Sequence, residues 1–151
     1  MKRLVLTALL GLTMGWATAA PDGAAVYTAH CAACHQPDGA GAVGLAPPLQ
    51  GMLGARLNQP AGRNYLAGVL VSGLAGKIES KGVVYNGIMP NWQQLPDAEL
   101  AAVLNHVLTA FNAAELPAGH QPYSETALTE MRARKPSGKE LRAWRAESDT
   151  K

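Results

Sequence analysis

The chain has 151 residues, with 13 lysines and arginines, 11 aspartates and glutamates, and a formal net charge of +2. This length corresponds to one domain with room for an appendage, and no basic cluster of the kind that binds nucleic acid is present. Only two cysteines occur, both in one short motif, so the sequence offers no second pair for a disulfide framework.

The N-terminus has the pattern of a secretory signal peptide. A basic pair, Lys2 and Arg3, precedes an apolar segment of about a dozen residues, which is short for a membrane-spanning helix. We expect residues 1–20 to be a signal peptide cleaved after Ala19 or Ala20; an uncleaved anchor is the alternative. Removing the basic pair leaves 11 basic and 11 acidic residues. The exported chain is therefore predicted to have no net charge. The signal peptide predicts that it is periplasmic.

A first helix is predicted from Gly23 to about Ala33, with Asp22 as its N-cap. It runs into the pattern C-x-x-C-H, which attaches c-type haem. Two cysteines three residues apart lie on one face of a helical turn and can form thioethers to the two vinyl groups of one haem. The next residue is then held beneath the iron as its proximal ligand. These residues are Cys31, Cys34 and His35.

Three other interpretations of this motif are possible. A thioredoxin-like dithiol expects a preceding strand and a βαβ pattern, but the sequence before the motif is helical. A zinc site needs further cysteine or histidine ligands, and no second pair is present. A chance pair of helix cysteines followed by an unrelated histidine is the remaining alternative. The motif therefore favours one covalent haem c with its iron.

The segments after the motif are predicted to be mainly loops. Residues 36–61 hold many glycines and prolines without a sustained period, as expected of a loop that wraps a cofactor. Residues 64–72 form a short helix with Gly73 at its end, and residues 73–95 form another loop. Short helices between long loops bury little apolar surface. We therefore expect the chain to be poorly folded without haem.

Met89, just before the last helix, is the predicted sixth ligand of the iron. A thioether is a soft ligand that favours ferrous iron. The alternative is that this methionine merely fills a gap in the core. Met52 and Met131 are weaker candidates.

The remaining histidines are weaker candidates for the distal position, although ligation by two histidines remains an alternative. His30 precedes the motif and is expected to point away from the iron. His106 lies within a helix and is expected to be packed or hydrogen-bonded. His120 could reach the haem only if the C-terminal segment folds over it.

The last helix of the domain is predicted to begin near Pro96, with Asp97 and Glu99 at its positive end. Its apolar residues follow helical spacing over three turns. They are Leu100, Val103, Leu104, Val107, Leu108 and Phe111.

Residues 112–151 form a linker and a C-terminal extension of about two short helices. Ser124 is predicted to cap the first, and Ser137 with Glu140 forms a capping box that opens the second. The extension either lies on the domain or docks a partner.

Residues 22–111 resemble class I monohaem c-type cytochromes of the bacterial periplasmic kind. Several landmarks occur in the order typical of that family. They are Gly23 and Tyr27, the haem motif, Asp38-Gly39-x-Gly41, Ala46-Pro47-Pro48-Leu49, Met89-Pro90-x-Trp92, and Leu95-x-Asp97-x-Glu99-Leu100. The resemblance implies an all-α fold of three or four short helices over residues 21–111, in which the first and last helices cross.

The resemblance also implies a set of site residues. Cys31 and Cys34 would carry the haem, and His35 and Met89 would be its axial ligands. The carbonyl of Pro47 would accept a hydrogen bond from the proximal histidine. The haem pocket would be lined by Leu49, Tyr65 and Trp92, and Trp92 or Asn91 would reach a propionate. One departure is His106, where the family usually has an aromatic residue; the helix crossing is therefore expected to be polar or slightly loose, with Tyr27 facing His106.

Filled axial positions would leave the iron no site for substrate, so the predicted function is electron transfer without catalytic residues. The protein would act as a diffusing shuttle or as the cytochrome subunit of a larger oxidoreductase. Its partners would be redox proteins, such as a periplasmic dehydrogenase, reductase or oxidase. A small haem enzyme or gas sensor with a labile distal site is the main alternative, and a purely structural haem subunit is a third.

Overall fold

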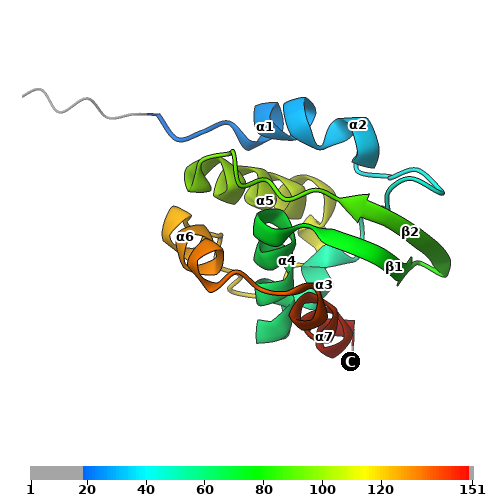
Figure 1. The fold of residues 1–151 in the computed structure, drawn as a ribbon. Coiled ribbons are helices and arrows are strands. Elements are labelled where there is room, and N and C mark those ends of the chain that lie inside the picture. Colours follow the sequence, from blue (N-terminus) through cyan, green and yellow to red (C-terminus); the bar gives the residue numbers. More distant parts are fainter. Residues whose placement is uncertain (1–18, 150–151) are drawn as a thin grey trace, which may run out of the picture.

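The computed structural model describes residues 19–149, so the predicted signal peptide lies almost wholly outside the described residues. The elements in chain order are α1 (Gly23–His30), α2 (Ala32–His35), α3 (Leu53–Arg56), α4 (Pro60–Ser72), β1 (Leu74–Ser80), β2 (Val83–Met89), α5 (Asp97–Phe111), η1 (Ala113–Glu115), α6 (Glu125–Arg134) and α7 (Gly138–Asp149). Helix α5 lies between α1 and α4, and α7 lies on the far side of α4 (Figure 1). Within residues 19–149, no helix has the length and hydropathy needed to cross a membrane.

The first and last helices of the predicted domain cross at close range. Asp22 caps α1, as expected, by accepting a hydrogen bond from the Ala24 N–H at 2.9 Å. A Cβ added to Gly23 would lie 2.2 Å from the Ala102 carbonyl oxygen on α5. The Tyr27 ring faces His106 with 5.6 Å between ring centroids. The expected facing pair is present, but the expectation of a loose crossing is wrong because the missing Cβ lets the two backbones approach.

Replacing Gly23 with alanine is expected to destabilise the fold. The new methyl group has no room against the backbone of α5, so the helices must separate, at a cost of ~1–3 kcal/mol for overpacking. Thermal unfolding of the haem-containing protein measures this, with the exposed position Ala25→Ser in the same helix as control. An unchanged melting temperature for Gly23→Ala would show that the crossing is not tightly packed.

The segment predicted as a loop over residues 73–95 instead contains an antiparallel hairpin, so the all-α prediction is wrong at this point. Strands β1 and β2 pair from Leu74 with Met89 to Ser80 with Val83. Their two-residue connection, Lys81 and Gly82, has positive φ at both positions, which matches the twist of a hairpin.

Helix boundaries differ from the predictions where loop-like composition hides short turns. The first helix, predicted to continue to Ala33, breaks at Cys31 and resumes as α2. Helix α4 begins at Pro60 rather than Asn64, because proline suits a first helical turn. Helix α3 lies inside the segment predicted as a long loop.

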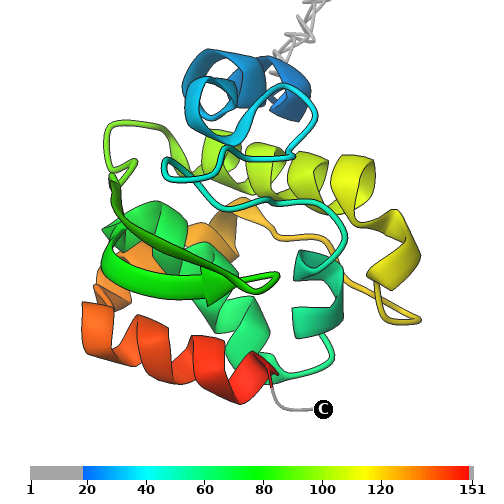
Figure 2. The same cartoon turned by 90° about the vertical axis from the view of Figure 1, so that its right-hand side faces the viewer.

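The C-terminal extension packs against the rest of the chain. Ser124 caps α6 by accepting from the Ala127 N–H at 3.2 Å, and Glu140 accepts from the Ser137 N–H at 2.9 Å, so both predicted caps are present. Leu128 and Leu141 have no exposed surface. Helix α6 packs on α5 and α4, while α7 runs beneath α4 and the hairpin (Figure 2). The two helices therefore complete the apolar core.

Asn112 lies where the domain was predicted to end, yet its side chain is among the most buried polar groups of the described residues. Its Oδ1 accepts from the N–H groups of Met52 and Leu53 at 3.0 and 2.9 Å. Its Nδ2 donates to the carbonyls of Leu49 and Val107 at 2.8 and 3.0 Å. One side chain thus joins the end of α5 to the start of α3 and to the loop before it.

Candidate functional site

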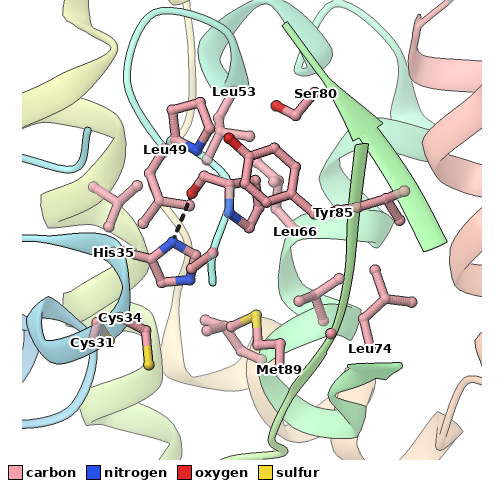
Figure 3. A pocket seen from close by; sticks show the side chains of 18 of the residues that line it. Cys31, Cys34, His35, Leu49, Leu53, Leu66, Leu74, Ser80, Tyr85 and Met89 are labelled. Carbon is pink, nitrogen blue, oxygen red and sulfur yellow. Dashed lines mark hydrogen bonds between the residues drawn. The ribbon is translucent and has the colours of Figure 1, made fainter. Parts of the chain in front are cut away.

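A cavity of about 290 Å³ lies between the α1–α2 corner, α4, α5 and the hairpin. Its walls are mainly apolar, and Figure 3 shows several of the side chains that project into it. Of the residues proposed from the sequence for the site, the structure brings all but Asn91 to this one cavity. These are Cys31, Cys34, His35, Pro47, Leu49, Tyr65, Met89 and Trp92.

The buried imidazole of His35 has a fixed tautomer. Its Nδ1 lies 2.9 Å from the Pro47 carbonyl oxygen, which can only accept, so Nδ1 carries the proton. Burial lowers the pKa of His35, which keeps the ring neutral, although the bond to Pro47 opposes this shift. The second ring nitrogen therefore keeps its lone pair, and it lies on the side of the ring that faces Met89 (Figure 3).

Gly41 allows the loop after the motif to present the Pro47 carbonyl. Its N–H donates to the His35 carbonyl at 2.9 Å, and its φ of +70° is one that L side chains rarely adopt. A Cβ at this position would lie 2.6 Å from the backbone of Pro47. The second glycine of the Asp38-Gly39-x-Gly41 landmark is thus required by the close approach of two backbone segments beneath the histidine.

The two cysteines lie at one end of the cavity, beside His35 (Figure 3). Cys31 is half-buried and Cys34 is exposed. Burial, with a smaller contribution from the neighbouring Cys34, raises the pKa of the Cys31 thiol to about 11. This thiol is therefore protonated at neutral pH.

Met89 ends β2, across the cavity from His35 (Figure 3). The turn that follows is fixed to α4, because the Trp92 N–H donates to the Leu70 carbonyl at 2.9 Å. Met52, the weaker candidate, also lines the cavity, and its sulfur accepts from the Ser80 hydroxyl at 3.2 Å.

The other histidines take different places. His106 packs against Tyr27 and Phe111, as expected of a packed residue, and neither it nor His120 lines the cavity. The expectation that His30 points away is wrong: it lines the cavity and contacts Trp92 edge-on, with 5.4 Å between centroids.

The hairpin supplies the wall that sequence reasoning missed. Alternate residues of each strand face the cavity, as the two-residue period of a strand requires. They are Leu74, Gly76, Ile78 and Ser80 on β1, and Tyr85, Gly87 and Met89 on β2; the largely exposed Ile88 lines the cavity as well. The β-branched and aromatic residues on either side of Lys81-Gly82 were the sequence signal that could have predicted this hairpin.

The donor set and the cavity fit a haem c. A neutral imidazole nitrogen and a thioether lie on opposite walls, two thiols lie at one end, and the walls are mainly apolar. Within residues 19–149, no cluster of three or more histidine, cysteine or acidic side chains is arranged to hold a separate metal ion. These features define a small haem-binding domain.

Comparison with known proteins agrees with a haem-binding domain. The family described as "Cytochrome c" matches residues 20–111. A protein named cytochrome c-552, from one strain of Thermus thermophilus, is 43% identical over 145 residues, which cover 96% of both chains. Another cytochrome c-552 from Thermus thermophilus is 44% identical over 124 residues, covering 82% of this chain and 94% of that protein.

This chain belongs to the cytochrome c family, whose members carry electrons on a covalently bound haem. The family match ends at residue 111, whereas the similarity to the first relative covers 96% of this chain and so extends into the C-terminal helices.

Proposed function

We propose that this protein is a periplasmic electron carrier with one haem c, attached through Cys31 and Cys34 and ligated by His35 and Met89. The observation that supports it best is the fixed tautomer of His35, whose free ring nitrogen and the Met89 sulfur face each other across the cavity. It serves as a shuttle or as the cytochrome subunit of an oxidoreductase. When bound, the haem supplies one-electron exchange between ferric and ferrous iron.

The residues of the chain set the conditions for that exchange. Pro47 holds the His35 ring in place and makes it a better donor through the Nδ1–H bond. Leu49 and Tyr65 add apolar surface to the cavity wall, which favours burial of the haem. The hairpin and the anchored Trp92 backbone keep Met89 opposite the histidine. None of these side chains acts as an acid, a base or a nucleophile.

We also assign the contact with redox partners to an exposed apolar surface at the cavity mouth. Val43 and Ile88 are 82% and 81% exposed, and Leu45 is 56% exposed. Leu45 and Ile88 also line the cavity, so this surface is continuous with the site. Exposed apolar side chains grouped in this way are typical of protein contact sites. The partner is a redox protein such as a periplasmic dehydrogenase, reductase or oxidase.

The visible spectrum of the exported protein, oxidised and reduced, with and without carbon monoxide, tests this function. We expect low-spin haem c, a weak methionine–iron band in the red part of the spectrum, and no effect of carbon monoxide, because both axial positions are filled. A high-spin spectrum or ready carbon monoxide binding would instead indicate a haem enzyme or gas sensor.

Replacing Met89 with alanine is expected to leave the haem attached, to lower the reduction potential and to admit carbon monoxide. The thioether favours ferrous iron, so its loss should shift the potential by a sizeable part of the roughly 0.8 V range that axial ligands control. Redox titration and carbon monoxide binding measure both effects. Met52→Ala, which removes another methionine of the same cavity, is the control and should retain the band. An unchanged potential in Met89→Ala would refute the ligand assignment.

A further inference from the structure

The segment that follows Met89 lies at the surface. Residues 90–95 connect β2 to α5, and four of the six are exposed. A surface segment of this kind is held largely by its hydrogen bonds and opens more easily than the core. Because Met89 precedes it directly, whatever holds this segment also limits the movement of Met89.

Arg132 of α6 binds this segment at two points. Its Nη1 donates to the Gln93 carbonyl and its Nη2 to the Leu95 carbonyl, each at 2.9 Å. Among the described residues, no backbone N–H donates to either carbonyl. The other backbone anchor of the segment to a helix is the bond from the Trp92 N–H to the Leu70 carbonyl, at 2.9 Å. Arg132 therefore holds the half of the segment that this anchor does not reach.

The first residue of α5 fixes the same guanidinium. The Nε of Arg132 donates to Asp97 Oδ1 at 2.7 Å, and its Nη2 lies 2.6 Å from that oxygen. The Thr129 hydroxyl of α6 donates to the other carboxylate oxygen at 2.8 Å. The side chains of Asp97 and Arg132 are only 16% and 28% exposed, so this ion pair is screened less than one in open water.

One guanidinium thus joins three parts of the chain. Helix α6 lies beside α5, at the end where α5 begins (Figure 1). Arg132 uses three nitrogen atoms to bind the connecting segment and Asp97 together. The planar fork of a guanidinium can do this, whereas the compact ammonium of lysine cannot.

The strand before Met89 is also tied to the C-terminal extension. Strand β2 pairs with β1, whose Ala75 and Glu79 carbonyls accept hydrogen bonds from Arg142 and Arg145 of α7. The pairing of the two strands gives this side of Met89 many bonds. The side that follows Met89 depends much more on a single side chain.

We propose that Arg132 is a positioning residue for the distal ligand: it holds residues 90–95 against α6 and so slows the release of Met89 from the iron. This inference rests on the proposed ligation by His35 and Met89. For the thioether to leave, the backbone that carries it must move outward, and that movement breaks the bonds from Arg132 to the segment. Arg132 does not line the cavity, so it acts through the segment.

Displacement of Met89 by imidazole in the ferric, full-length haem protein tests this role. At saturating imidazole the exchange rate equals the rate at which Met89 leaves the iron, because imidazole then fills the open position before the thioether returns. Arg132→Gln should raise this limiting rate about tenfold or more, since it removes charge-assisted hydrogen bonds. It should retain the methionine–iron band when imidazole is absent. Arg132→Lys should give most of the same increase, because it restores the charge without the fork.

Arg134→Gln is the matched control. Arg134 lies on the same helix and is exposed; it pairs with Glu140 at 3.9 Å, and its guanidinium carbon lies 4.4 Å from the centroid of the Trp144 ring. This variant removes the same charge, yet it should leave the limiting rate unchanged. Equal increases in Arg132→Gln and Arg134→Gln, or no increase in Arg132→Gln, would overturn the proposal. Full recovery of the slow rate in Arg132→Lys would overturn it too, because charge alone would then suffice.

Failure of the proposed ligation has a different signature. The unaltered protein would then lack the methionine–iron band, and its rate of imidazole binding would rise in proportion to concentration without reaching a limit.

Amide exchange in the unaltered protein covers the case in which the Arg132 variants do not fold. Saturating imidazole should reduce the protection of the Trp92 and Leu95 N–H groups, which are hydrogen-bonded within or next to the segment. The Leu100 N–H, in the first turns of α5, should keep its protection. Unchanged protection of Trp92 and Leu95 would contradict the proposal, because Met89 would then leave the iron without movement of the segment.

Discussion

Asn112→Ala is expected to remove a large part of the stability of the folded protein. Two N–H donors and two carbonyls lose their partner at once, and the bonds to the Leu53 N–H and the Val107 carbonyl are fully buried. At about 1–3 kcal/mol for each unsatisfied buried group, these two buried groups alone account for a loss on the order of 2–6 kcal/mol. A whole domain of this size has only about 5–15 kcal/mol of stability. Denaturant unfolding of the haem protein, followed by circular dichroism, measures the change.

Asn58→Ala is the matched control for this substitution. Asn58 is exposed, and its side chain donates one hydrogen bond, to the Ala55 carbonyl at 2.9 Å. Water can replace that bond, so the control should change the free energy of unfolding by less than about 1 kcal/mol. Equal effects of the two substitutions would mean that Asn112 does not hold the three segments together.

The double substitution Cys31→Ser and Cys34→Ser is expected to abolish covalent haem attachment and, with it, the fixed tertiary structure. The cavity of about 290 Å³ is walled by side chains from α4, α5 and the hairpin, which then lack a common core. At ~24 cal/mol per Å³ of unfilled volume, the cost is at most roughly 7 kcal/mol, comparable with the total stability of a domain. Denaturing electrophoresis with haem staining, near-ultraviolet circular dichroism and amide exchange measure the outcome.

The single substitutions distinguish attachment from folding. Each single variant retains the other thiol, which can still form one thioether. Cys34 is exposed and Cys31 is half-buried. Both single variants should hold haem through one bond and keep near-native circular dichroism. A double variant with native amide exchange and no haem would show that the polypeptide folds without its cofactor.

The parts of the molecule that the sequence predicted are those in which the signal is local. The C-x-x-C-H spacing, the Asp22 cap, the Ser137–Glu140 box and the apolar stripe of α5 each lie within a few turns of chain. The residues that form each pattern are close together in sequence, so each pattern could be recognised without knowledge of distant contacts. The resemblance to a family added Pro47, which lies 12 residues from its histidine.

The parts that were missed depend on distant contacts. The hairpin was hidden because glycines at 76, 82 and 87 dilute its alternating pattern, and because Lys81-Gly82 is a less familiar turn than Asn-Gly. Arg145 could not be assigned to the cavity, since 66 residues separate it from the Glu79 carbonyl to which it donates. Asn112 resembles the start of a linker because its bonds join segments about 60 residues apart.

Arg142 and Arg145, the two arginines of α7, bear on which substitutions β1 can accept. They donate to main-chain oxygens of β1, at Ala75 and Glu79, which every residue type presents. Substitution on the outward face of this strand therefore costs little, because the helix does not contact the strand through those side chains. A single-residue insertion, by contrast, would turn the cavity face outward. Homologues that conserve this architecture should consequently diverge freely in composition at the outward positions of β1 while keeping its length constant.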